Sequence, residues 1–247
     1  MLKASLRTGM IGFVLLSVLT AGASEFEPPL PPLPLNLNSE IGISTPTFRQ
    51  PPYDFDFASG FTVGGYAGAD RTKGTFVAFG IVPGVFESGT VIHRGRAGVG
   101  VYYRPEAEIA RVRLTPIVQY DYDWYARSNG RSALTTASFG IFVRSRNLDG
   151  TDPLIEMDRQ IVLWTELTSG NTSRSDLGRA VFLDGNQATV FLTMSRSRIY
   201  DVWIWTNVAC RAGRRFFPFL PSSKSSTHVN AIMPIFAFEE QPVGTIN

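Results

Sequence analysis

The feature that most constrains the fold is a strict alternation of residue types in the middle of the chain. Successive side chains leave opposite faces of a pleated strand, so a period of two indicates a half-buried β-strand. A second strand-like run, Ala133 to Arg146, follows Asn129-Gly130, a pair that favours a tight reversal because both residues accept positive φ. The sequence therefore predicts a large antiparallel hairpin over Glu108 to Arg146, with an aromatic face that a second sheet must cover. The alternating residues are Val118, Tyr120, Tyr122 and Trp124 in one set and Gln119, Asp121, Asp123 and Tyr125 in the other.

Short strand-like runs separated by turn residues occupy most of the chain from Gly60 onward, and no stretch keeps a helical period. Pro116 interrupts the first arm of the hairpin, which indicates a bulge or a switch of sheet because proline cannot donate to a ladder, with Ala107 to Thr115 and Ile117 to Tyr125 as two halves of one bent strand. We predict an all-β, jelly-roll-like antiparallel sandwich of roughly eight to ten strands. The other expected strands are Phe61 to Ala67, Thr75 to Val82, Val85 to His93, Ala97 to Arg104, Arg159 to Thr168, Ala188 to Ser195, Tyr200 to Cys210 and His228 to Phe238, with Tyr53 to Phe57 as an edge strand.

Glycine is frequent among the expected strands between Gly64 and Gly100. Because no strand-to-helix transition follows any of these glycines, they do not read as phosphate-binding loops. Glycine inside a strand instead indicates a bulge or a close approach of two backbones.

Tyr200 to Cys210 is the second strong strand, and both of its faces are largely apolar. Trp203 and Trp205 share one face, and mostly β-branched residues share the other. A strand that is apolar on both faces lies at the centre of its sheet, or turns one face into a ligand groove. Cys210, the only cysteine, is on the β-branched face and is therefore predicted to be buried and inert.

The first residues have the pattern of a Sec-type signal peptide. Lys3 and Arg7 supply positive charge, and a small-residue cleavage site ends at Ala23. The apolar run between them, Met10 to Leu19, is short for a transmembrane span. We predict that residues 1–23 are a signal peptide and that the protein is bacterial and secreted or periplasmic. An uncleaved N-terminal anchor is the alternative.

The remaining chain divides by composition into an arm, a domain and a tail. Residues 24–59 are rich in proline, which favours polyproline II or linker over a packed domain. Residues 60–240 carry the strand-like runs and are expected to form the sandwich, and residues 241–247 read as a tail.

The charge balance gives no sign of a nucleic-acid partner. The chain has 23 Lys+Arg and 21 Asp+Glu, and residues 1–23 contain two basic and no acidic side chains, so the mature chain has 23 − 2 = 21 basic against 21 acidic residues. Nucleic-acid binders normally carry a marked basic excess. No later stretch is apolar and long enough to predict a transmembrane segment in the mature chain.

Asp121 and Asp123 are the candidates for catalysis. Two apart on a strand, they share a face with side chains about 6–7 Å apart, a separation that paired glycosidase carboxylates use. The alternative is the solvated face of an amphipathic strand, with the carboxylates paired to arginines. The two histidines, His93 and His228, stand in no hydrolase or zinc motif.

A loop at Asp149-Gly150-Thr151-Asp152 supplies oxygen ligands of the kind that calcium prefers. Asp149 and Asp152 are therefore candidates for a structural calcium site. The alternative is an ordinary Asp-Gly turn, and no other cofactor is indicated.

Arginine pairs and tryptophans are the candidates for ligand binding. Each Arg-x-Arg pair projects from one side of a strand, and aligned pairs would form a basic stripe able to hold sulfate, uronate or phosphate. Flat indole rings can pack against sugars. The alternatives are arginines paired with acids across strands and tryptophans packed in the core. The candidates are Arg144, Arg146, Arg196, Arg198, Trp203 and Trp205.

These observations favour a non-catalytic secreted or periplasmic β-sandwich that binds a glycan or an extracellular protein partner. The alternative is a carbohydrate-active hydrolase that uses the pair Asp121 and Asp123. The identity of the ligand and the oligomeric state are left open by the sequence.

Overall fold

The computed structural model describes residues 47–60, 64–83, 89–180, 188–214 and 223–243. The predicted signal peptide and most of the proline-rich arm lie outside these residues, as does the tail beyond Val243. The described residues are nearly all strand, and they contain no helix long and apolar enough to cross a membrane.

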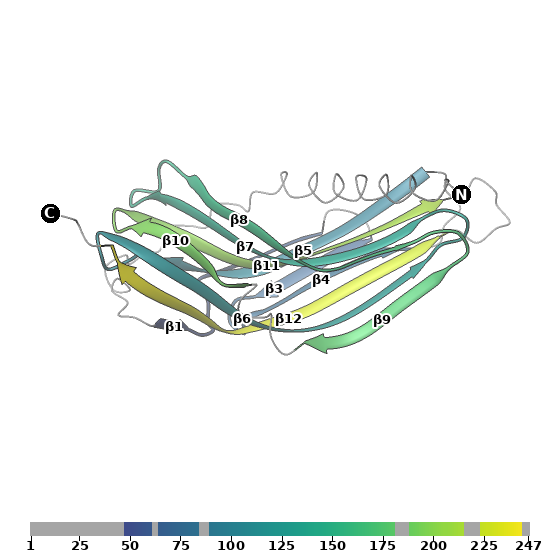
Figure 1. Cartoon of the computed structure of the whole chain (residues 1–247), viewed down its shortest axis with the longest axis horizontal. Coiled ribbons are helices and arrows are strands. Elements are labelled where there is room, and N and C mark those ends of the chain that lie inside the picture. Colours follow the sequence, from purple (N-terminus) through teal and green to yellow (C-terminus); the bar gives the residue numbers. More distant parts are fainter. Residues whose placement is uncertain (1–46, 61–63, 84–88, 181–187, 215–222, 244–247) are drawn as a thin grey trace, which may run out of the picture. The chain divides into compact units, whose positions relative to one another are not determined.

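Twelve described strands form two antiparallel sheets, which confirms the all-β sandwich and corrects the expected count of eight to ten. Sheet A has the order β10-β6-β12-β4-β3, with β1 paired to β12 and β9 to β6, and sheet B has the order β2-β5-β11-β7-β8. Figure 1 shows β12 and β9 of sheet A below β7 and β8 of sheet B. The strands are β1 (Thr47–Arg49), β2 (Phe55–Gly60), β3 (Gly65–Asp70), β4 (Thr75–Val82), β5 (Gly89–Tyr103), β6 (Ile109–Arg127), β7 (Ala133–Asn147), β8 (Leu154–Thr168), β9 (Ser173–Ala180), β10 (Val190–Ser195), β11 (Arg198–Arg214) and β12 (Lys224–Pro242).

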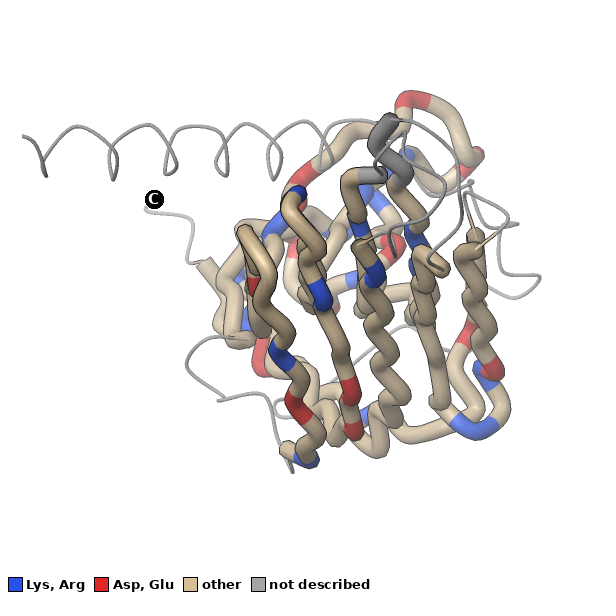
Figure 2. The backbone as a smooth tube through the Cα atoms, turned by 90° about the vertical axis from the view of Figure 1, so that its right-hand side faces the viewer, with Lys and Arg blue, Asp and Glu red and all other residues tan. Residues whose placement is uncertain are grey.

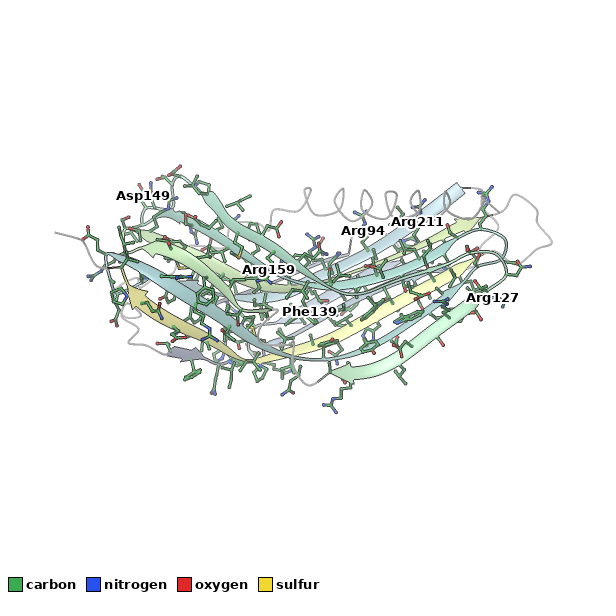
Figure 3. All side chains as sticks on the ribbon, viewed as in Figure 1. Arg94, Arg127, Phe139, Asp149, Arg159 and Arg211 are labelled. Carbon is green, nitrogen blue, oxygen red and sulfur yellow. The ribbon has the colours of Figure 1, made fainter. Side chains whose placement is uncertain are left out.

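The core lies between the facing sides of the two sheets. Alternation places Val118 of β6 and Val202 of β11 in it at 0% exposure each. Aromatic rings cross the interface edge to face, as between Phe76 of β4 and Phe139 of β7, whose centroids are 6.1 Å apart. Figure 3 labels Phe139 between the sheets. Burial of this apolar surface is the main force holding the sheets together.

The predicted hairpin over Glu108 to Arg146 is wrong. Both arms are strands, and Gly130 has the positive φ of 75° expected of the turn. However, β6 pairs with β12, β9 and β10 in sheet A, whereas β7 pairs with β11 and β8 in sheet B. The turn therefore carries the chain from one sheet to the other, and the two arms face each other across the core. Alternation fixes which side chains are buried, but not which strand pairs with which.

Pro116 does not divide its strand, because β6 runs unbroken from Ile109 to Arg127. It lies between the stretch of β6 that pairs with β10, up to Leu114, and the stretch that pairs with β9, from Tyr120 onward. The prediction of a bulge in the strand of Pro116 is therefore wrong: the register shift in the pairing of β6 with β12 lies on β12, between Ile232 and Ile235.

Glycines allow the two sheets to approach closely where β3 and β4 meet β5, as predicted. A Cβ on Gly65 would stand 2.0 Å from the carbonyl oxygen of Arg94, and one on Gly95 would stand 2.3 Å from that of Tyr66. Only hydrogen fits at such distances, so no other residue is accommodated without movement of a backbone.

Other expectations are refined by the structure. Val85 to His93 and Ala97 to Arg104 are parts of one strand, β5, in the described portion from Gly89. The expected edge strand near Phe57 is β2, which lies at one edge of sheet B, and β1 also precedes residue 60. Cys210 is buried as predicted, and its Sγ donates a hydrogen bond to the carbonyl oxygen of Gly80 at 3.0 Å.

Candidate functional site

The outer face of sheet B, the face that points away from sheet A, brings together most of the candidate ligand-binding residues. The prediction that Tyr200 to Cys210 is central in its sheet is confirmed, since β11 lies between β5 and β7. Side chains that are aligned across neighbouring strands share a face. The outer face is formed by Ile92, Arg94, Arg96, Gly98, Gly100 and Tyr102 of β5, by Asp201, Trp203, Trp205, Asn207, Ala209 and Arg211 of β11, and by Leu134, Thr136, Ser138, Gly140, Phe142, Arg144 and Arg146 of β7.

One half of this face is a packed aromatic layer. The ring of Trp203 lies 4.1 Å from that of Phe55 and 5.1 Å from that of Phe57, centroid to centroid. The indole of Trp205 lies over Gly140, where a Cβ would stand 2.1 Å from the ring. Trp203 and Trp205 are 1% and 5% exposed. The alternative interpretation of these tryptophans, as packed rather than sugar-stacking residues, is therefore the one that the structure supports.

A buried ion cluster continues the layer toward the start of β11. Asp201 Oδ1 accepts a hydrogen bond from Arg146 Nη2 at 3.0 Å, and Oδ2 accepts one from Arg144 Nε at 3.4 Å. All three side chains are buried. Burial raises the pKa of Asp201, while the guanidinium groups of Arg146 and Arg144 act in the opposite direction. The two arginines are thus held in place by a shared carboxylate, a structural role.

The other half of the face is basic, and all of its members except the buried Arg96 are half-buried. We call it the arginine patch: Arg94, Arg96, Asn207, Ala209 and Arg211. Strand pairing sets Arg96 opposite Asn207 and Arg94 opposite Ala209, with Arg211 two residues further along β11. Figure 3 labels Arg94 and Arg211, which lie near each other toward the same side of the sheet. Figure 2 shows basic positions on several neighbouring strands.

Arg96 is the most constrained member of the arginine patch. It is 5% exposed, and its guanidinium carbon lies 4.6 Å from the ring centroid of Trp205. The pKa of Arg96 is lowered to about 10, mainly by burial; Asp158 of β8 acts in the opposite direction, and nearby Arg94 adds to the lowering. The lowered pKa means that the surroundings do not fully compensate the buried positive charge. An anion next to Arg96 would therefore be stabilised.

The carbonyl oxygen Oδ1 of Asn207 and the nitrogen Nε of Arg211 are buried without a hydrogen-bond partner, and Trp203 Nε1 on the same face shares this property. Buried polar atoms normally have a partner, so each exception calls for an explanation. Asn207 and Arg211 are half-buried as whole residues, whereas Trp203 is buried.

None of Arg94, Arg96, Asn207 and Arg211 was among the candidate residues predicted from the sequence. The sequence does show that Arg94 and Arg96 share one face of their strand, and that Asn207 and Arg211 share one face of theirs, because the members of each pair are an even number of residues apart. It does not show that β5 and β11 are neighbours, which is what brings the four residues together.

The other arginine pair does not join this face. Arg198 donates to Ser145 Oγ at 2.8 Å, to Asn147 Oδ1 at 3.1 Å and to Asp152 Oδ2 at 3.1 Å. The carbonyl oxygen of Arg196 accepts a hydrogen bond from Arg104 Nε at 2.7 Å. Arg198 therefore holds together the loops at one end of sheet B.

Asp121 and Asp123 lie on the solvent side of sheet A, as their shared parity predicted. Asp121 Oδ1 is 3.2 Å from Arg179 Nε on β9, and Asp123 Oδ2 is 3.6 Å from His228 Nδ1 on β12. Both carboxylates are more than half exposed, at 57% and 51%. This geometry is that of a solvated face with cross-strand pairs.

Asp149 and Asp152 lie in the β7–β8 turn. Asp149 Oδ1 accepts hydrogen bonds from the hydroxyl and the backbone N–H of Thr151 at 2.6 and 2.9 Å, and the hydroxyl bond contributes most to lowering the pKa of Asp149. Asp152 Oδ2 pairs with Arg198. Among the described residues no group of three or more His, Cys, Asp or Glu side chains is arranged to hold a metal ion. The two carboxylates act here as turn and ion-pair groups.

Comparison with known proteins gives no family. No family model and no curated protein matches the chain. Among solved structures, TmCBM61 in complex with β-1,4-galactotriose is similar over 76% of this chain and 90% of that one, at 12% identity and a TM-score of 0.22. The VP2 subviral particle of infectious bursal disease virus is similar over 86% of this chain and 47% of that one, at 12% identity and a TM-score of 0.17. Because both TM-scores are low, neither similarity bears on the function of this chain.

Proposed function

We propose that the chain is a non-catalytic binding module that binds a glycan or a protein partner through the arginine patch and its apolar surroundings. The secreted or periplasmic location rests on the predicted signal peptide. All twelve described strands belong to sheet A or sheet B, so no described strand forms a further layer over the outer face of sheet B. A face that is both apolar and charged, and that lies beside no other strand layer, is suited to contact a ligand.

The observation that carries the proposal is that exposed apolar side chains adjoin the half-buried basic side chains of Arg94 and Arg211 in this half of the face. Ile92, Val162 and Leu167 are 37%, 48% and 37% exposed. One row across the sheet contains Arg211 of β11, with Ile92 of β5 on one side of it and Leu134 of β7 and then Leu167 of β8 on the other. Another row contains Asn207 of β11, followed by Ser138 of β7 and Val162 of β8. The buried aromatic layer and the Asp201 ion cluster would hold the same strands rigid beneath such a contact.

Binding is proposed in preference to hydrolysis because the candidate carboxylates Asp121 and Asp123 are solvent-exposed and paired. No aromatic or arginine side chain of the outer face of sheet B lies with them, since they are on sheet A. Four of the aromatic and arginine candidates, Arg144, Arg146, Trp203 and Trp205, in contrast, gather on one face with a half-buried region at its end.

Ala209 offers the most direct test of this surface. It lies at the centre of the arginine patch between Arg94 and Thr136, is half-buried, and has the smallest side chain of the patch. We expect Ala209→Tyr to weaken binding of any ligand at this surface by at least about tenfold, since the ring would occupy the contact area. The measurement is a glycan array and a partner pull-down with residues 24–247, followed by titration of the hits.

Leu177→Tyr on β9 is the matched control, because Leu177 is 83% exposed and lies in sheet A. Both variants add one ring to an exposed or half-exposed position, and the control is expected to bind as the parent does. Equal binding by the parent and Ala209→Tyr would place the contact elsewhere and refute the proposal.

A further inference from the structure

We propose that the edge of β8 that does not face β7 is a docking site for an extended peptide segment of a protein partner, which pairs with it as a further strand of sheet B. This inference goes beyond the proposed function, because it assigns a second contact surface that is formed by backbone groups at the edge of the sheet. Three observations support it: the length of β8, the side chains that it exposes, and the contacts that hold it in place.

β8 is the longest strand at a sheet edge. It ends the order of sheet B and, among the described residues, pairs only with β7. It has 15 residues, whereas the other edge strands, β1, β2, β3, β9 and β10, have between 3 and 8. A strand edge presents a row of N–H and C=O groups, which natural proteins usually keep short or interrupt with Lys, Pro or a bulge. β8 contains no Lys or Pro, so it offers the longest row of backbone groups to another strand.

Two irregularities in the pairing of β7 with β8 define which part of the edge is regular. The register shifts at Glu156 and at Leu163, each of which is an extra residue in β8. Bulges at a sheet edge hinder the addition of a further strand. Between them, residues 157–162 pair without interruption with residues 138–143 of β7. We call residues 157–162 the docking segment, and its length is typical of a strand.

The docking segment exposes an apolar and an acidic side chain on the outer face of sheet B. Val162 is 48% exposed, and Asp158, four residues away on the same face, is exposed as well. Side chains on neighbouring strands pack against each other where they are directly opposite. An added strand would therefore cover Val162 with an apolar side chain and place a basic one beside Asp158. The expected partner is an extended segment with an apolar and a basic residue four positions apart.

The backbone at this edge favours a peptide over a glycan. N–H donors and C=O acceptors alternate along the edge of a strand with the period of the strand itself. An extended polypeptide repeats its own donors and acceptors with the same period, and the addition of a strand to a sheet edge is a general mode of peptide recognition. A saccharide chain does not repeat a donor and an acceptor in this way.

Side chains tie β8 to sheet A and hold the edge in place. Arg159 Nη1 donates a hydrogen bond to the carbonyl oxygen of Thr189 at 3.0 Å, and Figure 3 labels Arg159. Glu166 Oε1 accepts one from Arg174 Nη1 of β9 at 2.7 Å. A strand that is already fixed loses little freedom when a partner binds, so these contacts favour docking.

The probe for the test is a displayed library of random peptides selected for binding to residues 24–247. The selected peptides are then synthesised and titrated against the parent and against Val162→Lys, which places a charged side chain on the docking segment. Leu177→Lys is the matched control, because Leu177 is also an exposed apolar residue on an edge strand, β9 of sheet A. Amide hydrogen exchange with and without each peptide shows which strand is covered.

We expect the peptides to slow amide exchange in residues 157–162, and we expect Val162→Lys to weaken their binding about tenfold while Leu177→Lys leaves it unchanged. Only every second N–H of an added strand faces its neighbour. Methylation of the peptide nitrogen at alternate positions should therefore abolish binding for one set of positions and spare it for the other. Equal urea midpoints of Val162→Lys and the parent would show that folding is not the cause.

Three outcomes would overturn the assignment of the β8 edge. If no selected peptide slows exchange in residues 157–162, or if both methylated sets bind as the parent peptide does, no strand is added there. If Ala209→Tyr abolishes peptide binding and Val162→Lys does not, the peptides bind the arginine patch, so the proposed function holds and the β8 edge is not the docking site. If sedimentation shows a dimer of the parent that Val162→Lys dissociates, the occupant of the edge is a second copy of the chain.

Discussion

Replacing Asp201 by asparagine is expected to lower the free energy of unfolding by about 3–5 kcal/mol, the range found when one partner of a buried ion pair is removed. Asp201 is 0% exposed and bridges two guanidinium groups that are themselves buried. Asparagine keeps the shape of the side chain but not its charge, so Arg144 and Arg146 would lose their shared carboxylate in a poorly solvated environment. Urea denaturation followed by tryptophan fluorescence measures the change.

Asp121→Asn is the control for this substitution. It removes the same charge from a pair with Arg179 whose side chains are 57% and 74% exposed, and exposed pairs contribute about 0–1 kcal/mol. If Asp201→Asn were as mild as Asp121→Asn, the ion cluster would not be what holds β7 to β11 at this end of sheet B.

Gly65→Ala is expected to destabilise the sandwich by about 1–3 kcal/mol, the usual range for overpacking a close contact. The added Cβ would stand 2.0 Å from the carbonyl oxygen of Arg94, which belongs to the backbone of the opposite sheet. No rotation of a side chain can relieve that contact, so β3 and β5 must move apart. The measurement is again the urea midpoint.

Gly68→Ala on the same strand separates this effect from the general consequence of adding a methyl group to a glycine. Its nearest neighbour would be the hydroxyl of Tyr66 at 3.0 Å, the end of a side chain that is 60% exposed and can turn aside. A loss of stability equal to that of Gly65→Ala would contradict the close approach of the two sheets.

Local features of the fold were predictable from the sequence because they depend on period and on residue chemistry. The alternation from Val118 to Tyr125 indicated the buried side of β6, and the apolar faces of Tyr200 to Cys210 indicated a central strand. The glycines near Gly95 indicated a close backbone approach. Each of these properties is decided by neighbours along the chain or by the size of one side chain.

Pairing was not predictable in the same way, and the hairpin shows why. A reversal at Asn129-Gly130 is compatible with strands that pair side by side and with strands that face each other across a core. The choice depends on which distant strands compete for each edge: Trp124 of β6 is aligned with Thr227 of β12, and Phe139 of β7 with Thr206 of β11. The arginine patch could not be predicted for the same reason, because its residues come together only through the pairing of β5 with β11.

Binding of a ligand on the arginine patch is tested most directly by arginine modification read by mass spectrometry, with and without a glycan or protein that binds residues 24–247. Phenylglyoxal reacts with accessible guanidinium groups, so a ligand on the arginine patch should slow the modification of Arg94 and Arg211. Arg174 and Arg179 on β9, which are 64% and 74% exposed, should react at an unchanged rate. Protection of the β9 arginines without protection of Arg94 and Arg211 would contradict the assignment of the outer face of sheet B as the binding surface.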